Sequence, residues 1–480
     1  MKRILNNLSI LPSLTARFAA AIRTLTFVLF AFVIAGTALA QEKSAKVQWI
    51  CTTQAQPWQD MPVTAATSPA TADSPIITVD PSVNYQKIIG FGGCFNELAW
   101  QALQPLDSSQ REEVFQALFS PKGCNFTACR EGIGANDFAL AWYSLDETPG
   151  DYAMDHFNID EDRKTLIPFI KEAMKYQPKL AIWAVPWSPP SWMKTNGQYK
   201  GGKMKQDPQT LSAYALYFSK YAQAYLKEGI PLRAIMPQNE PNYNDNVYPQ
   251  CVWSGQEINR FLRDYLVPQI KNDRVPVEVW LGTIPVGDIH AFTEVVFGNP
   301  VTSPSVVGVG YQYEGQKTIL ATHKAYPDKL ILQTETECYR GNNFWSEGMN
   351  TFHHMIEDTN NFSNGYMFWN MILNEKGTSS WGWRQNSMIT VNSQTQKVTY
   401  NPEFYAMKHF GNLVQPGALR VGVSRGPFSK LTALQNPSGS LVVLFSNDSK
   451  VNIKASLKIG ETLVPVDAPP ASMNTVVVSP

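Results

Sequence analysis

The sequence predicts an α/β fold in which a (β/α)8 TIM barrel carries an appended β-sandwich domain. Eight short apolar runs follow one another between residues 87 and 371, as the eight strands of such a barrel would. The segments between them repeat apolar residues at spacings of three and four, the period of an amphipathic helix. After Pro416 the chain changes to short alternating strands separated by turn residues, which is typical of a small all-β domain.

Residues 1–40 are predicted to be a signal peptide and not part of the fold. Basic residues such as Arg17 and Arg23 precede the apolar stretch 25–36, and residues 37–40 end it with small side chains in an A-x-A pattern. A membrane anchor is the alternative, but a spanning helix needs ~20 apolar residues, and this stretch is shorter. We therefore expect cleavage before Gln41 and export to the periplasm or the extracellular space, without stable membrane insertion.

Residues 41–84 contain two β-like pieces, 47–53 and 75–80, and have no sheet of their own to complete. We expect these N-terminal strands to join the C-terminal β-sandwich, which is predicted over residues 413–480. Its own strand candidates lie in residues 419–427, 430–448, 450–460 and 474–480.

The barrel is predicted over residues 85–412. Its strand candidates are residues 87–93, 127–135, 179–186, 233–241, 277–283, 306–313, 329–335 and 365–371. Helical patterns between them include residues 161–177, 211–229, 254–270 and 343–358. An open doubly wound sheet is the main alternative. Such a sheet usually carries a glycine-rich phosphate loop after its first strand, and the segment 90–93 matches that loop only in part.

Composition excludes several classes of protein. The chain has 40 Lys and Arg residues against 40 Asp and Glu residues, which argues against a nucleic-acid partner held by a basic surface. An apolar content of 44% with 17% charged residues is typical of a folded globular protein. The six cysteines form no C-x-x-C motif and the six histidines no H-x-x-x-H pair, so no metal site is expected. Disulfide pairing and oligomeric state do not follow from the sequence.

Two of the predicted strands end in carboxylates. Catalytic side chains of a TIM barrel lie at the C-terminal ends of its strands. Glu240 ends the fourth run, and Glu335 and Glu337 end the seventh. Hydrolysis of a glycosidic bond uses two carboxyl groups on either side of that bond. Glu240 could instead be a helix-start carboxylate, because Pro241 could open a helix. Residues 335 and 337 alternate onto one strand face, so spacing does not choose between them.

Other strand ends supply candidates for sugar binding. An aromatic ring can pack its face against the C–H side of a sugar, while Asp, Asn and Arg side chains hydrogen-bond its hydroxyls. Each aromatic residue taken singly could equally belong to the core, but their shared position favours binding. The candidates are Arg130, Asp137, Trp187, Trp192, Tyr311, Tyr313, Trp369 and Asn370.

Residues 422–426 (GVSRG) match the nucleophile elbow of serine hydrolases. That elbow belongs on a strand-to-helix turn and needs a histidine later in the chain. No histidine follows residue 409, so we do not expect a serine hydrolase.

Seven ordered motifs between residues 86 and 374 resemble glycoside hydrolase family 30, the family of lysosomal glucosylceramidase and of microbial endo-β-1,6-glucanases. They are QKIIGFGGCFNE (86–97), REGIGANDFALAWYSLDETPGD (130–151), HFNIDEDRKTLIPFI (156–170), VPWSPPSWMKTNG (185–197), PQNEP (237–241), LQTETECY (332–339) and YMFWNMILN (366–374). The resemblance implies a barrel with a β-sandwich, a retaining double-displacement mechanism, and no cofactor.

The resemblance also implies residue roles. By position, Glu240 matches the general acid/base, and Glu335, not Glu337, matches the nucleophile. Asn239 would bond the sugar 2-hydroxyl, and Arg130 would support the nucleophile. The residues matched to the subsite of the cleaved sugar are Arg130, Asp137, Trp187, Asn239, Tyr313 and Trp369.

Departures from the lysosomal pattern bear on the substrate. The pair Tyr311-Gln312 replaces a His-Trp pair, and the loop 374–386 offers Trp381 and Trp383 where the lysosomal enzyme has one Trp and then a basic residue. A second Trp could form the floor of a leaving-group subsite. We therefore expect an exported endo-β-1,6-glucanase-type enzyme. The alternatives are a glucosylceramidase, an enzyme for another β-glucoside or xyloside and, in a different class, a non-catalytic carbohydrate-binding protein.

Overall fold

The computed structural model describes residues 46–66, 68–69, 71, 73–335 and 340–479. The predicted signal peptide, Glu337 and Cys338 lie outside the described residues. The other five cysteines are buried and free. None of the described helices is long and apolar enough to cross a membrane.

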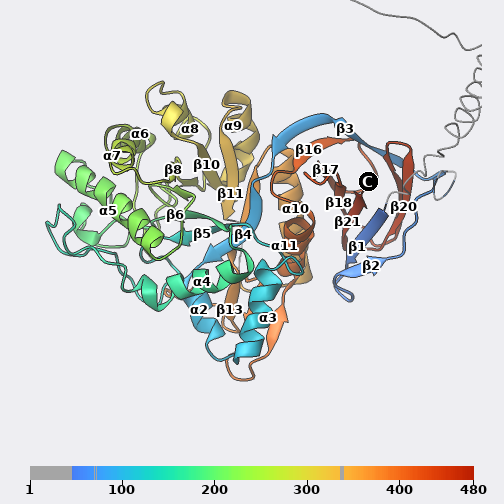
Figure 1. The fold of residues 1–480 in the computed structure, drawn as a ribbon, viewed down its shortest axis with the longest axis horizontal. Helices are drawn as coiled ribbons and strands as arrows, with labels where there is room; N and C mark the ends of the chain where they lie inside the picture. The colour runs from blue at the N-terminus through green and yellow to red at the C-terminus, as the bar shows by residue number, and fades with distance from the viewer. Residues whose placement is uncertain (1–45, 67, 70, 72, 336–339, 480) are drawn as a thin grey trace, which may run out of the picture. The chain divides into compact units, whose positions relative to one another are not determined.

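A parallel sheet forms the barrel, in the order β8-β7-β6-β5-β4-β12-β11-β10-β9 (Figure 1). The strands are β4 (Gly90–Phe95), β5 (Ala128–Gly132), β6 (Ala181–Val185), β7 (Ala234–Ile235), β8 (Glu278–Val279), β9 (Thr283–Ile284), β10 (Gly308–Gln312), β11 (Leu330–Glu335) and β12 (Gly365–Asn370). The two ends of this order, β8 and β9, come from one run of chain. Between them the amide of Leu281 donates to the carbonyl of Gly308, at 2.9 Å. The sheet therefore closes on itself, and each of the eight predicted runs supplies one strand position of the barrel.

Helices connect consecutive strands and pack around the sheet. They are α2 (Glu97–Leu103), α3 (Ser108–Phe119), α4 (Leu166–Tyr176), α5 (Pro208–Lys227), α6 (Gly255–Phe261), α7 (Val267–Asn272), α8 (Thr293–Phe297), α9 (Ile319–Ala325), α10 (Trp345–Asn360) and α11 (Pro402–Leu413). Short 3₁₀ turns are η1 (Asp162–Lys164), η2 (Ser191–Met193), η4 (Ser303–Ser305) and η5 (Tyr313–Thr318).

The predicted helix 254–270 is interrupted by a wider π turn, η3 (Leu262–Leu266), between α6 and α7. Pro268 has no N–H and cannot continue the α-helical hydrogen bonding into α7. The amide of Val267 donates to the carbonyl of Leu262 instead, five residues back, which is the π pattern. Periodicity predicted one continuous helix here, and the π turn that divides it into α6 and α7 was not predicted.

The N-terminal and C-terminal strands form one further sheet, in the order β2-β1-β21-β18-β17-β16-β3-β19-β20. Its strands are β1 (Lys46–Thr52), β2 (Gln59–Met61), β3 (Ile76–Lys87), β16 (Leu419–Val423), β17 (Lys430–Gln435), β18 (Leu441–Asn447), β19 (Ile453–Ile459), β20 (Thr462–Ala468) and β21 (Ser472–Ser479). β1 pairs with β21 and β3 pairs with β16, so the N-terminal strands join the C-terminal ones as predicted. Residues 462–468 were not among the predicted strands.

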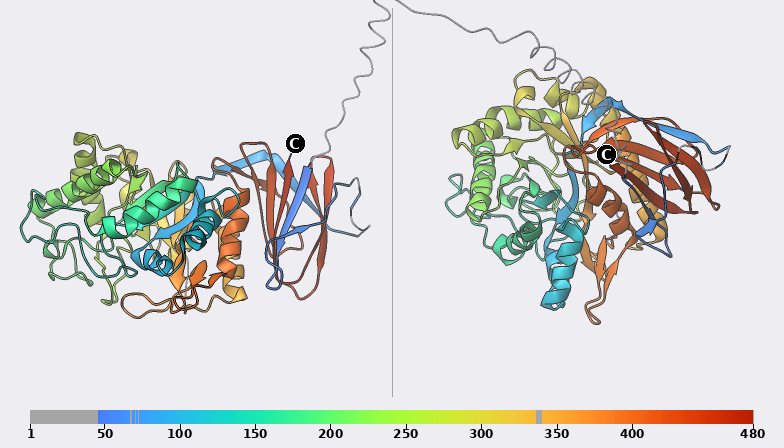
Figure 2. Two further views of the ribbon diagram at one scale, coloured as in Figure 1. Left: turned by 60° about the horizontal axis from the view of Figure 1, so that its bottom comes forward. Right: turned by 45° about the vertical axis from the view of Figure 1, so that its right-hand side comes forward.

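The β-sandwich has its own apolar core and packs against the barrel through α10 and α11 (Figure 2). Phe428 and Phe445 stack in that core with their ring centroids 4.2 Å apart. At the junction, the imidazole of His409 on α11 lies between the hydroxyls of Thr52 and Thr475, at 2.9 and 2.7 Å. A small third sheet, β13 (Ile372–Asn374), β14 (Ile389–Val391) and β15 (Val398–Tyr400), follows β12.

Candidate active site

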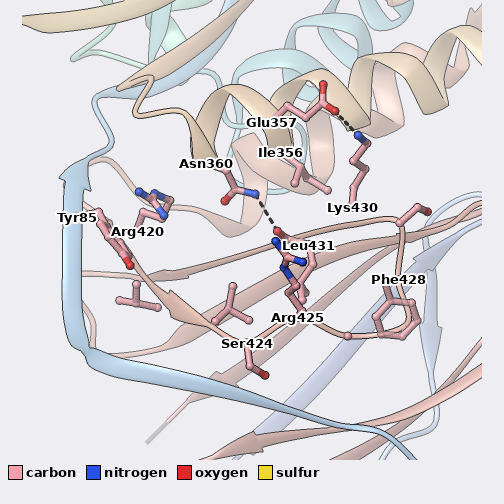
Figure 3. Close-up of a pocket in the computed structure, with 14 residues that line it drawn as sticks. Tyr85, Ile356, Glu357, Asn360, Arg420, Ser424, Arg425, Phe428, Lys430 and Leu431 are labelled. Carbon is pink, nitrogen blue, oxygen red and sulfur yellow. Dashed lines mark hydrogen bonds and ion pairs between the residues drawn. The ribbon is translucent and has the colours of Figure 1, made fainter. Parts of the chain in front are cut away.

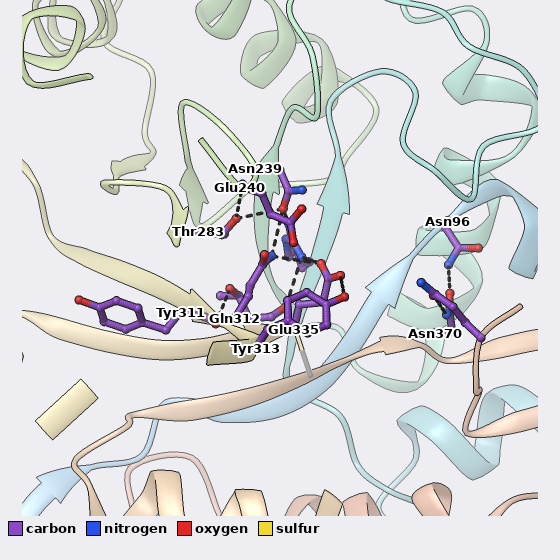
Figure 4. A network of polar contacts seen from close by, with 12 residues as sticks. Asn96, Asn239, Glu240, Thr283, Tyr311, Gln312, Tyr313, Glu335 and Asn370 are labelled. Atoms are coloured by element: carbon purple, nitrogen blue, oxygen red, sulfur yellow. Dashed lines mark hydrogen bonds and ion pairs between the residues drawn. The ribbon is translucent and has the colours of Figure 1, made fainter. Parts of the chain in front are cut away.

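Glu240 and Glu335 lie at the C-terminal end of the barrel strands, in one network of polar contacts (Figure 4). Glu335 is the last residue of β11, and Glu240 follows β7 closely along the chain. Both side chains are largely buried, with 7% of Glu240 and 5% of Glu335 exposed. Burial of two carboxyl groups is costly unless other groups compensate for it, so their partners decide what each can do.

Three side chains donate to the carboxylate of Glu335. Arg130 on β5 forms an ion pair with Oε2 at 2.6 Å. The hydroxyl of Tyr313 donates to Oε1 at 2.6 Å, and Nε2 of Gln312 donates to Oε2 at 3.1 Å. Charge-assisted hydrogen bonds of this kind are strong and directional, so Glu335 is fixed in orientation.

Arg130 is fully buried and connects Glu335 to Asn239. Its Nη2 donates to Oδ1 of Asn239, and its guanidinium lies over the Trp187 ring at 4.6 Å and the Trp369 ring at 5.7 Å. The two indole rings also contact each other, with centroids 5.1 Å apart. Trp187 and Trp369 are 2% and 0% exposed, so they support the guanidinium instead of presenting open faces.

Asn239 is held from one side only. Its Oδ1 also accepts from Thr283 Oγ1 and from Gln312 Nε2, both at 3.0 Å. Its Nδ2 donates to no other side chain or carbonyl among the described residues. One amide donor of a rigidly held side chain is thus free for a ligand hydroxyl.

Glu240 has a different environment from Glu335. Its Oε2 accepts one hydrogen bond of 2.8 Å, from the hydroxyl of Tyr248. Burial, followed by the negative charge of Glu335, raises the pKa of Glu240 to about 8. Glu240 is therefore protonated at neutral pH and can donate a proton.

Glu240 and Tyr313 both have left-handed backbone conformations, with φ of +47° and +42°. This region is unfavourable for residues other than glycine and costs about 1–3 kcal/mol at each position. The amide of Glu240 is held by the carbonyl of Thr283 at 3.0 Å. Such strain persists where the surroundings fix it, and it is frequent at functional sites.

Asp137, in the loop after β5, completes the acidic part of the site. It is buried, and its carbonyl accepts from the amide of Ser380 at 3.0 Å, which connects this loop to the loop between β13 and β14. Burial, with the negative charges of Glu335 and Glu240, raises the pKa of Asp137 well above its usual range.

A cavity of about 360 Å³ opens beside Glu240 and Tyr313. Trp381 and Trp383 lie on its wall with centroids 5.4 Å apart, and Trp381 also stacks on Tyr248 at 5.7 Å. The remaining lining residues are Tyr243, Asp245, Pro285, Val286 and Glu314. The wall is therefore aromatic and acidic, and none of the described Lys or Arg residues lines it.

Three of the predicted sugar-binding candidates lie elsewhere, which corrects the sequence interpretation. Tyr311 faces the outer helices, where its hydroxyl contacts Thr293 at 2.8 Å and Thr322 at 2.5 Å. Trp192 donates to the carbonyl of Asp146 at 3.0 Å, and its ring contacts the ring of Tyr152 edge to face. The side chain of Asn370 is occupied by hydrogen bonds with Asn96, Gln385 and Asn386.

Sequence reasoning did not single out Gln312, Thr283 and Tyr248 as site residues. Side chains alternate along a strand, so the outward Tyr311 places Gln312 inward, but the sequence does not show which of the two faces the site. Tyr313 departs from the alternation because it begins the turn η5 and not a strand position. Tyr248 lies in an irregular loop that has no periodic signal.

Comparison with known proteins gives a consistent result. Residues 88–414 match the model of the glycosyl hydrolase family 30 TIM-barrel domain, and residues 417–476 match that of the family 30 β-sandwich domain. Lysosomal acid glucosylceramidase of Mus musculus is 27% identical, over 80% of this chain and 79% of that protein. Endo-1,6-β-D-glucanase neg1 of Aspergillus fumigatus is 26% identical, over 83% and 87%. The solved structure of the endo-β-1,6-glucanase BT3312 superposes with a TM-score of 0.80 at 24% identity, covering 90% of this chain and 99% of that one.

Proposed function

Since the chain belongs to glycosyl hydrolase family 30 and hydrolyses β-glycosides, we propose that it cleaves β-glucosidic bonds with retention of configuration, using Glu335 as the nucleophile and Glu240 as the acid and base. The observation that carries this proposal is the contrast between the two carboxyl groups. Three side chains donate hydrogen bonds to the carboxylate of Glu335. In contrast, burial raises the pKa of Glu240 and keeps that side chain protonated at neutral pH. Two carboxyl groups with separated environments are what acid and nucleophile roles require.

In the first step an oxygen of Glu335 attacks the anomeric carbon, and the bond from that carbon to the leaving oxygen breaks. The proton of Glu240 passes to the leaving oxygen. Arg130 stays beside Glu335 as its negative charge is consumed. The product is a glucosyl ester on Glu335, and Glu240 is left ionised.

In the second step water attacks the anomeric carbon and Glu240 accepts its proton. Esterification has removed the negative charge of Glu335, which is one cause of the raised pKa of Glu240. The pKa of Glu240 therefore falls between the steps. The bond to Glu335 then breaks, and both carboxyl groups return to their starting states.

Several residues would hold the cleaved sugar. The free Nδ2 of Asn239 is suited to the 2-hydroxyl, whose interactions strengthen in the transition state of such reactions. Asp137 would bond further hydroxyls. Trp187 and Trp369 would act indirectly, by holding the guanidinium of Arg130 beside Glu335.

We propose an endo-β-1,6-glucanase-type substrate. The cavity beside Glu240 would take the leaving group, with Trp381 and Trp383 as its floor and Tyr248 beside them. Its acidic wall favours a neutral chain over an anionic one. A relative and a similar structure, neg1 and BT3312, are named as enzymes of this specificity. Glucosylceramide is the second candidate, supported by the similarity to the lysosomal enzyme.

A two-substrate panel tests the substrate. The purified protein is given a β-1,6-linked glucan or glucosylceramide in detergent, with Glu335→Gln as the blank. Oligosaccharides from the glucan alone would support the proposal. Glucose and ceramide from the lipid alone would overturn it in favour of glucosylceramidase activity.

Export after cleavage before Gln41 also belongs to this proposal. It is supported by the order of basic, apolar and small residues at the start of the chain. N-terminal sequencing of the protein recovered from the periplasm and from the medium tests it. Material that retains residues 1–40 would contradict it.

A further inference from the structure

A second cavity, of about 530 Å³, lies at the junction of barrel and sandwich (Figure 3). It is formed by the last turns of α10, by β3 and by the segment that joins β16 to β17. α10 carries the chain back from the barrel end where Glu335 lies, so this cavity is separate from the candidate active site. The two cavities share no lining residue.

Arg420 is a buried cation that has no counter-ion in the described part of the chain. Only 9% of it is exposed, and its guanidinium lies over the Tyr85 ring at 3.7 Å and the Phe362 ring at 4.6 Å. Nε donates to Oε1 of Gln86 at 2.9 Å, but its Nη atoms make no hydrogen bond with any described residue. Burial lowers the pKa of Arg420 to about 10. A buried charge is costly unless it is paired, so an anion in this cavity would relieve that cost.

A second guanidinium lines the same cavity. Arg425 is exposed and has no hydrogen bond or ion pair within the described part of the chain. The only carboxylate among the lining residues, Glu357, is already paired with Lys430. Arg420 and Arg425 therefore leave the cavity with an uncompensated positive charge.

The rest of the lining suits a sugar. Tyr85 is 40% exposed, and because Arg420 covers one face of its ring, the exposed edge of the phenol is the part that a sugar ring beside Arg420 can contact. Ser424, Ser429 and Asn360 supply polar groups for hydroxyls. Ser424 and Arg425 belong to the GVSRG segment, which has no part in glycoside hydrolysis.

We propose that this junction cavity binds an acidic saccharide, a sugar that carries a carboxylate, with the carboxylate at Arg420 and Arg425 and the ring against the exposed edge of Tyr85. A guanidinium presents parallel N–H groups that match the two oxygens of a planar carboxylate. The volume is within the range of small-molecule sites, about 300–1,000 Å³.

Ligand-observed NMR titration at fixed ionic strength tests the proposal with three probes. Methyl β-D-glucuronide and methyl β-D-glucoside differ only in the carboxylate, and sodium sulfate supplies an anion without a ring. We expect the glucuronide to bind more tightly than either of the others. We also expect that it does not inhibit hydrolysis of an aryl β-glucoside, which keeps this test independent of the proposed function.

Arg425→Ala is the principal variant, because the residue is exposed and the fold does not depend on it. Loss of its charged hydrogen bonds should weaken glucuronide binding about tenfold. Arg420→Lys keeps the charge but loses the planar guanidinium, and should weaken binding similarly. Its melting temperature should also fall, because the contacts of Arg420 with Tyr85, Phe362 and Gln86 are lost. Arg111→Ala on α3 removes a guanidinium elsewhere and should change nothing.

Four results would overturn the proposal. They are equal binding of glucoside and glucuronide, binding of sulfate as tight as that of glucuronide (an adventitious ion only), undiminished glucuronide binding by Arg425→Ala, and the absence of measurable glucuronide binding.

Discussion

Tyr248 donates a hydrogen bond of 2.8 Å to Glu240, and the ring of the same tyrosine stacks on Trp381 with centroids 5.7 Å apart. The residue that contacts the proposed acid is thus also part of the aromatic wall where the leaving group would bind. Proton donation and recognition of the leaving group are connected through one side chain.

This contact predicts a pH effect. The proposed acid works only while it is protonated, so kcat/KM should fall as pH rises through about 8, the pKa of Glu240. The hydrogen bond from Tyr248 lowers that pKa. Tyr248→Phe should therefore move the alkaline limb of kcat/KM on an aryl β-glucoside to higher pH. Tyr243→Phe, in the same cavity, is the control. A limb that stays in place in Tyr248→Phe would contradict this account.

Glu335→Gln and Glu240→Gln should each nearly abolish turnover of the glucan, by ~10³-fold or more, because each removes an essential group of the double displacement. Both substitutions are nearly isosteric, so circular dichroism and melting temperature should stay close to those of the wild type. Full activity in either purified variant would refute the assignment.

Arg130→Lys should lower kcat by ~10²-fold with a smaller change in KM. The charge is kept, but one ammonium group cannot replace the two guanidinium nitrogens that donate to Glu335 and to Asn239. Steady-state kinetics measure the effect, and thermal unfolding checks the fold. A variant with wild-type kcat would mean that this pair of hydrogen bonds does not position the carboxylate.

Trp383→Ala should raise KM for the glucan about fivefold, since an aromatic contact is worth about 0.5–1.5 kcal/mol. Kinetics on an aryl β-glucoside, which lacks the extended leaving group, should change little. Trp58→Ala in the sandwich is a matched loss of an indole and should affect neither substrate. Equal loss on both substrates would place Trp383 outside a leaving-group subsite.

A buried carboxyl group away from the site predicts a dependence of stability on pH. Burial raises the pKa of Asp162 to about 7, although Tyr143 and Tyr225 donate to it. The folded state therefore binds the proton of Asp162 more tightly than the unfolded state does. The stability gained from this protonation is fully present below pH ~4 and is lost as the pH rises through about 7.

The free energy of unfolding should fall between pH ~4 and pH ~7, and Asp162→Asn should reduce that fall by roughly 2–4 kcal/mol. Denaturant titrations at several pH values measure it, with the exposed Asp160→Asn as the control. An unchanged pH dependence in Asp162→Asn would contradict the burial argument.

The sequence predicted the barrel well because each strand is a compact apolar run and strand ends carry the polar residues. It placed Glu240, Glu335, Arg130 and Asn239 at strand ends, and the structure brings these four into one network. Strand position alone left Glu335 and Glu337 as alternatives, and the resemblance to glycoside hydrolase family 30 chose Glu335 and assigned the role of Asn239.

Other features depend on tertiary contacts that periodicity does not contain. Tyr311 was expected in the site but points outward, because it alternates with the inward Gln312. Tyr248 reaches Glu240 from an irregular loop. The uncompensated positive charges of Arg420 and Arg425 can be recognised only when the surroundings of both residues are known.

Covalent trapping of the nucleophile tests the central assignment most directly. With 2-deoxy-2-fluoro-β-D-glucosyl fluoride, the fluorine at C2 slows both steps, while the good leaving group still allows the first. A glucosyl ester should therefore accumulate. Mass spectrometry of the digested protein should find the 2-fluoroglucosyl group on Glu335, with no labelling in Glu335→Gln. A label on another residue, or inactivation without a covalent adduct, would contradict the assignment.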